Sequence, residues 1–232
     1  MTEGKYHSAV VTGGSAGILG PIFVEVLRNA KFDNVFTPSL PEWDLTRNLE
    51  QTYRYQIDNY GVPRVLILNA AIDNPPGSAA TLFPEHDDII NVNYLVNKHL
   101  CRLFWEGMNK LDGIKHIVFI GSILGNVAAD YRNYPDNFDK PVDYGASKAA
   151  CLSLVRNLAV RGAKNRVLVN QLSFGAVVNP QHSPEFKRKF LKNVPLDRFL
   201  TKEDVSNALI GILGQTAMTG QQMLVDGGYT CL

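Results

Sequence analysis

The sequence has few cysteines, no long hydrophobic run and almost no net charge, and each shortage excludes a class of protein. Its three cysteines, Cys101, Cys151 and Cys231, are odd in number, far apart and without metal-ligand spacing. They suit buried thiols of a reducing compartment better than a disulfide framework. No apolar stretch approaches the roughly 20 residues that span a bilayer. The 23 basic residues balance 22 acidic ones, which argues against nucleic acid or an anionic membrane surface as a partner.

The N-terminus also lacks the pattern of a signal peptide, because Met1–His7 leads directly into an apolar segment. What the chain does have is 232 residues, 45% of them hydrophobic, which is enough for one domain with a substantial core. We therefore expect a cytoplasmic α/β protein with no metal site.

Apolar, β-branched runs alternate with amphipathic segments along the chain, which is the pattern of βαβ units. The expected strands are Ser8–Thr12, Asn34–Thr37, Arg64–Asn69, Lys115–Gly121, Arg166–Leu172 and Gln222–Val225. The expected helices are Ile18–Ala30, Arg47–Tyr60, Asp87–Met108, Tyr144–Gly162, Pro184–Lys192 and Lys202–Leu213. This alternation predicts one domain over residues 1–232, built as a doubly wound parallel sheet with helices on both faces.

The first expected strand runs into the glycine-rich segment Thr12–Gly20, and a helix follows at once. Glycines at such a junction permit a tight turn, and the helix N-terminus favours a pyrophosphate group. A purely structural turn is the alternative. The position after the first strand of a βαβ chain favours dinucleotide binding.

Two further strands deliver small or polar residues to the same edge of the sheet. The third ends in Asn69-Ala70-Ala71 and the fourth in Ser122. Ligands of open α/β sheets bind at the carboxyl ends of the strands, so both places are candidate site positions. Ser122 can equally be a residue that merely opens a loop.

Tyr144 and Lys148 stand four residues apart on an expected helix and therefore share one face. A phenol titrates near ~10, and a nearby ammonium group lowers that pKa by favouring the phenolate. The pair can thus form a proton donor and acceptor, although the same spacing is common on solvated helix faces.

Taken together, these motifs resemble the short-chain dehydrogenase/reductase family. The matching segments, in the family's order, are Thr12–Gly17, Asp44-Leu-Thr, Asn69-Ala-Ala, Asn93, Ser122, Tyr144-x-x-x-Lys148 and Val225-Asp-Gly-Gly228. The resemblance implies a single Rossmann-like domain that binds NAD(P), acts on a small-molecule substrate and assembles as a homodimer or homotetramer.

The resemblance also implies roles for four catalytic residues. Tyr144 would be the general acid/base, and Lys148 would lower the pKa of Tyr144 and bind the nicotinamide ribose. Ser122 would hold the carbonyl oxygen, and Asn93 would anchor a water that links Lys148 to solvent. Asn93 can instead be a structural residue that kinks its helix, and Asn91 is a rival two residues away.

Several positions would contact the cofactor by the same resemblance. They are Gly13, Ser15, Gly17, Ile18, Asp44, Leu45, Asn69, Ala70, Ala71, Tyr144, Lys148, Gly175 and Val177. Asp44 is also a candidate N-cap for a helix that begins at Thr46, and the two roles are compatible.

The chain departs from the family pattern in its first half. The family usually has a glycine two residues after Gly17, whereas this chain has Leu19 there and Gly20 in the next position. The short segment Pro38–Asp44 replaces a whole helix that the family has between its second and third strands. The second strand ends in Thr37-Pro38-Ser39, without the acidic residue that selects NAD. The absence of a repelling acid inclines the cofactor assignment toward NADP.

Two departures lie in the second half. Phe174-Gly175 replaces the family's Pro-Gly, and Ser122 and Tyr144 are separated by an unusually long segment. We expect residues 123–142 to cover the site, where Tyr131, Arg132, Tyr134 and Asn137 bind a polyhydroxylated or anionic substrate. An oligomer contact or a plain surface loop is the alternative. Residues 175–200, with His182, Arg188 and Lys189, would form a lid, although a lone His182 is more often a surface residue.

The sequence therefore predicts an NAD(P)-dependent oxidoreductase that interconverts a carbonyl and a secondary alcohol on a small polar, sugar-like substrate. Two alternatives stay open. One is a regulatory nucleotide-binding protein with a degenerate site, and the other is a sugar-nucleotide epimerase or dehydratase.

Overall fold

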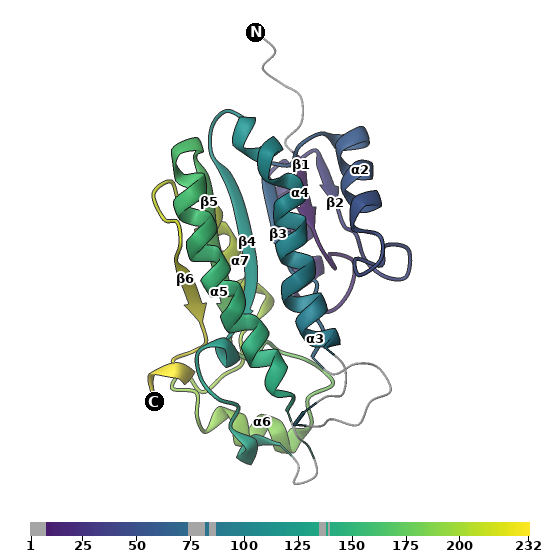
Figure 1. The fold of residues 1–232 in the computed structure, drawn as a ribbon. Coiled ribbons are helices and arrows are strands. Elements are labelled where there is room, and N and C mark those ends of the chain that lie inside the picture. Colours follow the sequence, from purple (N-terminus) through teal and green to yellow (C-terminus); the bar gives the residue numbers. More distant parts are fainter. Residues whose placement is uncertain (1–7, 74–81, 84–86, 135–137, 139) are drawn as a thin grey trace.

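The computed structural model describes residues 8–73, 82–83, 87–134, 138 and 140–232, and its centre is a six-stranded sheet (Figure 1). The strands are β1 (Ser8–Val11), β2 (Asn34–Phe36), β3 (Val65–Leu68), β4 (Lys115–Ser122), β5 (Val167–Phe174) and β6 (Gln222–Val225). They lie in the order β2-β1-β3-β4-β5-β6, and all pairs are parallel. From β1 the chain first adds β2 on one side and then crosses back to add β3 on the other side, which makes the sheet doubly wound. The predicted fold class is confirmed.

Helices cover both faces of this sheet (Figure 1). They are α1 (Leu19–Asn29), α2 (Leu49–Tyr60), α3 (Asp88–Ile90), α4 (Asn97–Lys110), α5 (Val142–Gly162), α6 (Pro184–Leu191) and α7 (Lys202–Leu213). Successive strand residues point to opposite faces, so Ala9 and Val11 belong to the core beneath α1 and α7. Val10 belongs to the core beneath α2, α4 and α5 on the other face. The site edge is therefore held by a sheet that is buried on both sides.

The expected helix over Asp87–Met108 differs from the structure in one respect. A π-helical turn, Asn91–Val96, lies between α3 and α4. Its wider winding is common at functional positions, and here it carries Asn93 with its side chain inside the protein. Apolar periodicity cannot separate a π turn from an α-helix, so this feature was not predicted.

The segment between β2 and α2 contains no helix, as its sequence indicated. In place of a helix, the ring of Phe36 on the edge strand packs against Trp43, Tyr55 and Tyr60, with ring centroids 5.1–6.2 Å apart. Aromatic contacts of this kind supply a large buried area. They close the edge of the sheet beside the glycine turn.

The structure bears on two expectations from the composition, the burial of the cysteines and the lack of a membrane-spanning segment. Cys101 and Cys151 are buried, but Cys231 is exposed, which corrects the expectation that all three are interior thiols. No helix within the described residues is both long and apolar enough to cross a membrane.

Candidate active site

The glycine turn after β1 is shaped by close backbone contacts. Gly13 has φ +63°, and its N–H donates to the Pro38 carbonyl at 2.8 Å. Gly20, in the first turn of α1, packs so tightly that an added Cβ would lie 2.2 Å from the Gly13 carbonyl oxygen. Gly17 has φ +68° and open space around it. The turn therefore leaves the N-terminal end of α1 accessible to a ligand, with Gly20 in the place where the backbone approach is closest.

Thr12 ties this turn to the end of β3. Its Oγ1 accepts hydrogen bonds from the N–H groups of Asn69 and Ala70, both at 2.9 Å. The Asn69 amide in turn donates to the Thr12 carbonyl at 2.9 Å. Thr12 was not among the predicted site residues, although it begins the glycine motif. It acts by positioning the two strand ends against each other.

A groove of about 850 Å³ runs across these strand ends. Predicted cofactor residues that line it are Gly13, Gly17, Ile18, Asp44, Leu45, Asn69, Ala70 and Ala71. Five predicted cofactor residues, Ser15, Tyr144, Lys148, Gly175 and Val177, are not among the lining residues, and the region after β5 contributes Asn179 and Gln181. The structure thus brings most of the predicted cofactor set together around one groove.

Asp44 holds a turn beside the groove. Its Oδ1 accepts from the Thr46 N–H at 2.9 Å and from the Thr46 hydroxyl at 2.7 Å. These hydrogen bonds keep the pKa of Asp44 below its usual value. No helix begins at Thr46, because α2 begins at Leu49 with Asn48 as its N-cap. The expected N-cap role is therefore replaced by a role in the turn that precedes the helix.

Ser122, Tyr144 and Lys148 converge at the end of β4. Ser122 lies close enough to the Tyr144 phenol to lower its pKa, and its Oγ accepts from the Leu124 N–H at 3.1 Å. Lys148 is buried, and its Nζ donates to the Ile120 carbonyl at 2.9 Å. The same Nζ lies 5.7 Å from the centroid of the Tyr144 ring.

Burial raises the pKa of Tyr144 to about 12, and the charge of Asp73 adds to this effect, while the hydrogen bond with Ser122 opposes it. Burial also lowers the pKa of Lys148. Both directions follow from the cost of removing a charged form from water. The lowering of the Tyr144 pKa that the family resemblance implied is therefore not what this arrangement produces, and the phenol is protonated at neutral pH.

Asn93 connects three parts of the site. Its Oδ1 accepts from the Ile72 N–H, and its Nδ2 donates to the Ile72 carbonyl, both at 2.8 Å. The same Nδ2 donates to Ser147 Oγ at 3.2 Å. This pairing fixes the segment after β3 against α5 and fits the structural interpretation of Asn93. The water-anchoring interpretation stays a prediction.

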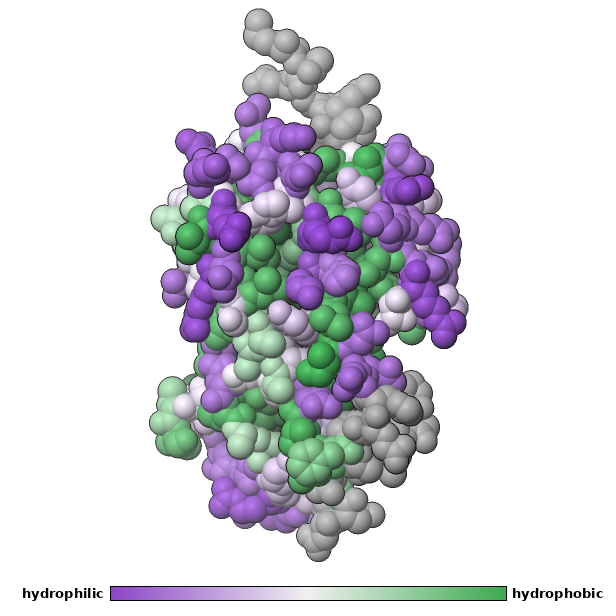
Figure 2. Space-filling model, viewed as in Figure 1, coloured by the Kyte–Doolittle hydropathy of each residue, from purple (hydrophilic) through white to green (hydrophobic). Residues whose placement is uncertain are grey.

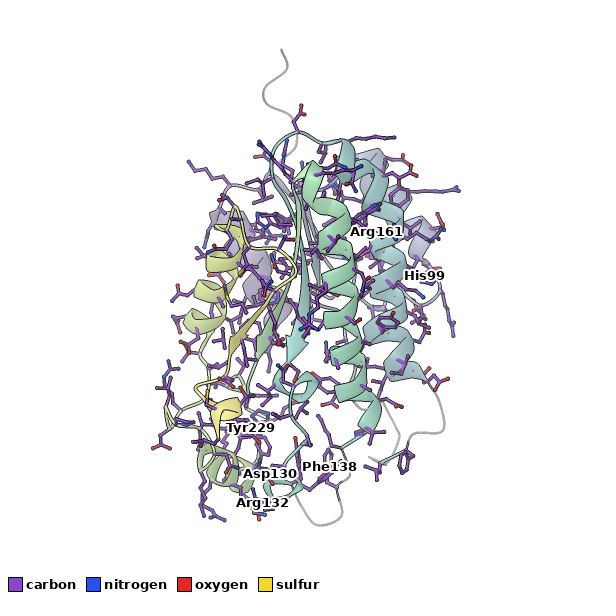
Figure 3. The ribbon with its side chains drawn as sticks, turned by 60° about the vertical axis from the view of Figure 1, so that its left-hand side comes forward. His99, Asp130, Arg132, Phe138, Arg161 and Tyr229 are labelled. Carbon is purple, nitrogen blue, oxygen red and sulfur yellow. The ribbon has the colours of Figure 1, made fainter. Side chains whose placement is uncertain are left out.

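The long segment between β4 and α5 packs on the region after β5. Figure 3 shows Asp130, Arg132, Phe138 and Tyr229 together at the end of the molecule where α6 lies, with Arg161 toward the other end. The Asn193 amide donates to Asp130 Oδ2 at 3.0 Å, which joins this segment to the end of α6. The described residues of this segment (123–134, 138 and 140–142) and the α6 region therefore form one surface layer beyond the strand ends.

The predicted substrate residues of that layer do not all face inward. The Arg132 side chain is 87% exposed and pairs with Asp130, and Tyr131 is also exposed. Tyr134 is half-buried and stacks on Phe138 with ring centroids 4.9 Å apart, and burial raises its pKa. Asn137 lies outside the described residues.

His182 occupies an aromatic environment in the expected lid. Its ring centroid lies 4.8 Å from that of Phe186 and 5.7 Å from that of Phe199, and burial lowers its pKa. His182 is thus half-buried rather than a plain surface residue. Arg188 and Lys189 lie on α6, where Lys189 pairs with Glu185.

The sequence analysis missed Asp73 and Lys140, which form an ion pair beside Tyr144. Asp73 lies two residues after the Asn69–Ala71 segment, and Lys140 lies two residues before the start of α5 at Val142. The Lys140 Nζ lies 4.8 Å from the centroid of the Tyr144 ring. The only sequence signal for these two residues was that Asp73 lies near the Asn69–Ala71 motif and Lys140 near Tyr144. Within the described residues no group of three or more His, Cys, Asp or Glu side chains is placed to hold a metal ion.

Comparison with known proteins places these features in a family. A family model described as enoyl-(acyl carrier protein) reductase matches residues 45–230. The chain is 28% identical to the NADH-dependent L-xylulose reductase of Ambrosiozyma monospora over 62% of this chain and 54% of that protein. It is 27% identical to the ribulose-forming D-arabinitol 2-dehydrogenase of Scheffersomyces stipitis over 79% of this chain and 67% of that protein. The alignment with the first of these relatives thus spans little more than half of its length.

Solved structures agree on the architecture. A short-chain dehydrogenase from Leptospira borgpetersenii with bound NAD+ superimposes with a TM-score of 0.83 at 22% identity, covering 97% of this chain and 93% of that one. A 4-hydroxyisoleucine dehydrogenase complexed with NADH gives 0.79 at 19% identity, covering 97% and 99%. The structures support the fold, and the family model covers most of the chain and includes Ser122, Tyr144 and Lys148. The chain is an enzyme that belongs to the short-chain dehydrogenase/reductase family.

Proposed function

We propose that the protein is an NAD(P)-dependent oxidoreductase that interconverts a carbonyl and a secondary alcohol on a small polyhydroxylated substrate, with Tyr144 as the general acid/base. The observation that carries the proposal is the contact of Ser122 with the Tyr144 phenol at the end of β4, at the edge where open α/β sheets bind ligands. The names of the two sugar-alcohol relatives support the substrate class.

The groove fits a dinucleotide cofactor. An added Cβ at Gly20 would collide with the Gly13 carbonyl, whereas the space around Gly17 is open, so the turn is tight where it folds and open where a pyrophosphate would lie. The groove residues Gly13, Gly17, Ile18, Asp44 and Asn69 would hold the cofactor. When bound, the cofactor supplies or accepts the hydride.

The groove lining bears on the choice between NAD and NADP. It contains the carboxylate of Asp44 in the segment after β2, and among the described residues no lysine or arginine lines it. A 2′-phosphate is stabilised by a basic partner and repelled by acids. We therefore propose NAD, in place of the inclination to NADP that the sequence alone gave.

The side chains around Tyr144 suit proton donation. A phenol with its pKa raised to about 12 is protonated at neutral pH, so Tyr144 can give its proton to the oxygen that forms during carbonyl reduction. Ser122 would hold that oxygen beside the phenol. Lys148, fixed by the Ile120 carbonyl, would contribute positive charge and contact the nicotinamide ribose.

The test replaces Tyr144 by Phe and compares it with Tyr53→Phe, which removes a phenol on α2 where the ring packs on Phe104. We expect Tyr144→Phe to bind NADH like the wild-type protein in calorimetry and to lose turnover by roughly 10²-fold or more, while Tyr53→Phe keeps both. Equal turnover in Tyr144→Phe would exclude the proposed acid/base role.

The same assay separates the alternatives. Cofactor binding without turnover across a panel of ketoses would favour a regulatory nucleotide-binding protein. Turnover with no net release of NAD or NADH would favour an epimerase or dehydratase that retains its cofactor.

The assembly is proposed to be a homodimer or homotetramer. In the view of Figure 2, apolar side chains gather along the middle of the face formed by α4 and α5, with hydrophilic ones toward the sides. Val160 on α5 is 81% exposed, which suits a covered surface. Sedimentation velocity would test this, and a monomer at all concentrations would contradict it.

A further inference from the structure

The ion pair between Asp73 and Lys140 leaves one carboxylate oxygen without a partner. Oδ2 of Asp73 pairs with Lys140, whereas Oδ1 has no hydrogen-bond partner among the described residues, and the Asp73 side chain is 44% exposed. A carboxylate oxygen is an acceptor only, so the hydrogen-bonding capacity of this carboxylate is not used up by Lys140. Such an atom in a native site calls for an explanation, of which a missing ligand donor is one.

The position of Asp73 points to a substrate as that ligand. Asp73 lines the groove at the Ala71–Ile72 end, and its charge acts on the phenols of Tyr144 and Tyr134. Lys140 keeps its ammonium group 4.8 Å from the centroid of the Tyr144 ring. The unpartnered oxygen therefore lies close to the place where Tyr144 would meet the reacting oxygen.

A second unpartnered atom comes from the opposite side of the site. Nδ1 of His182 is inaccessible to solvent and has no hydrogen-bond partner within the described part of the chain. His182 is close enough to Lys140 for the lysine charge to lower its pKa. Asp73 and His182 thus come from separate segments, and each interacts electrostatically with Lys140.

The chemistry of this environment selects the ligand group. A carboxylate oxygen accepts from hydroxyl, amide or ammonium donors, and of these a sugar-like substrate carries hydroxyls. Lys140 and Lys148 already place two positive charges beside Tyr144, and a further cation would be repelled. An uncharged hydroxyl satisfies Asp73 without that penalty.

We propose that Asp73, held in place by Lys140, accepts a hydrogen bond from a substrate hydroxyl on the carbon next to the carbonyl that Tyr144 serves. The enzyme would thus select α-hydroxy ketones and the corresponding vicinal diols over simple ketones and alcohols. This inference rests on the proposed function of Tyr144. It adds that the Asp73 carboxylate binds the hydroxyl next to the reacting carbonyl.

The experiment compares two probes with the same carbon skeleton, 3-hydroxy-2-butanone and 2-butanone, by the ratio of their kcat/KM values with NADH and with NADPH. Wild-type enzyme is expected to favour the hydroxy ketone by roughly tenfold or more, because a site built to bind a hydroxyl discriminates against an analogue without it. Asp73→Ala is expected to bring this ratio close to unity. Lys140→Met keeps the Asp73 carboxylate but removes the ion pair that holds it in place, so it is expected to reduce the ratio partly. Glu25→Ala is the control, because it breaks a comparable ion pair with Lys202 between α1 and α7.

Each outcome decides one proposal. A wild-type ratio near unity, or an unchanged ratio in Asp73→Ala, overturns the inference and leaves the proposed function intact. Should Asp73→Ala fail to fold, Asp73→Ser in the same assay carries the test, with thermal unfolding to verify its integrity. A preference for 3-amino-2-butanone over the hydroxy ketone would overturn the hydroxyl assignment. Failure of the wild-type enzyme to reduce any ketone, ketoses included, would sink the proposed function and the inference together.

Discussion

The ammonium nitrogen of Lys140 lies 4.8 Å from the centre of the Tyr144 ring. It is closer to the ring than the nitrogen of Lys148, at 5.7 Å, although Lys148 is the lysine that the motif singles out. Lys140 is in turn paired with Asp73, so three charged groups surround the phenol together with Ser122 and Tyr134. The electrostatics of this tyrosine therefore depend on residues from three separate segments.

Asp73→Asn is expected to lower the pKa of Tyr144. The Asp73 charge disfavours the phenolate and raises that pKa, so its removal moves the titration toward neutral pH. In alcohol oxidation, where the phenolate accepts the proton, the pH of half-maximal rate would fall. A pH–rate profile at saturating cofactor measures this, with Glu25→Gln as the control, and an unchanged or upward shift would contradict it.

Gly20→Ala is expected to abolish measurable cofactor binding, because the new Cβ would lie 2.2 Å from the Gly13 carbonyl oxygen. Gly17→Ala is the matched comparison: its Cβ meets open space, but φ is +68°, so it should cost about 1–2 kcal/mol of stability through backbone strain. Isothermal titration with NADH and thermal unfolding measure the two effects. Similar binding by Gly20→Ala and wild-type protein would show that the turn can relax.

Asn93→Ala is expected to destabilise the protein. It leaves the Ile72 N–H and carbonyl without their partners, at about 1–3 kcal/mol for each group that stays buried. Ser147→Ala, which removes only the 3.2 Å contact with Asn93 and the hydroxyl's own bond to the Tyr144 carbonyl, should cost less. Urea unfolding compares them. Loss of activity in Asn93→Ala at unchanged stability would instead favour a role in proton transfer alone.

Asp204 is expected to contribute to stability against acid. Its carboxylate accepts from the Thr201 N–H at 2.7 Å and from Arg198 at 2.6 Å, and these bonds lower the pKa of Asp204 from 3.8 to about 2. A carboxylate whose pKa is lower in the folded state stabilises the protein at pH values above its unfolded-state pKa. That contribution is lost as the pH falls from about 4 to 2. Asp204→Asn should be less stable at pH 6 and lose less stability over that range. Denaturant unfolding at several pH values checks this, with the exposed Asp58→Asn as control.

The fold was predictable because its signals are local. Each of the six strands is an apolar or β-branched run, and the expected and observed strands agree within two residues at either end. The helix start at Lys202 was also predictable, since Thr201 and Asp204 form a capping box there. The π turn at Asn91–Val96 was not, because its register is decided by the bonds of Asn93 with Ile72 in another segment.

The site was predictable only where a motif marks it. Tyr144, Lys148 and Ser122 meet as their spacing and strand ends indicated. The partnership of Asp73 and Lys140 joins residues 67 positions apart, and no local pattern reports such a contact. The direction of the Tyr144 pKa was missed for a similar reason, since the motif shows the lysine but not the burial.

The aromatic edge beside β2 gives the enzyme an optical consequence. Trp43 is one of only two tryptophans in the chain; it lines the groove and touches Phe36 and Tyr55. An indole in that position is an intrinsic fluorophore at the adenine end of the site, where bound dihydronicotinamide cofactor can quench it by energy transfer. The other tryptophan, Trp105 on α4, lies outside the groove lining, so a Trp105→Phe variant would leave Trp43 as the single reporter. Cofactor occupancy can thus be followed in the native protein without a label.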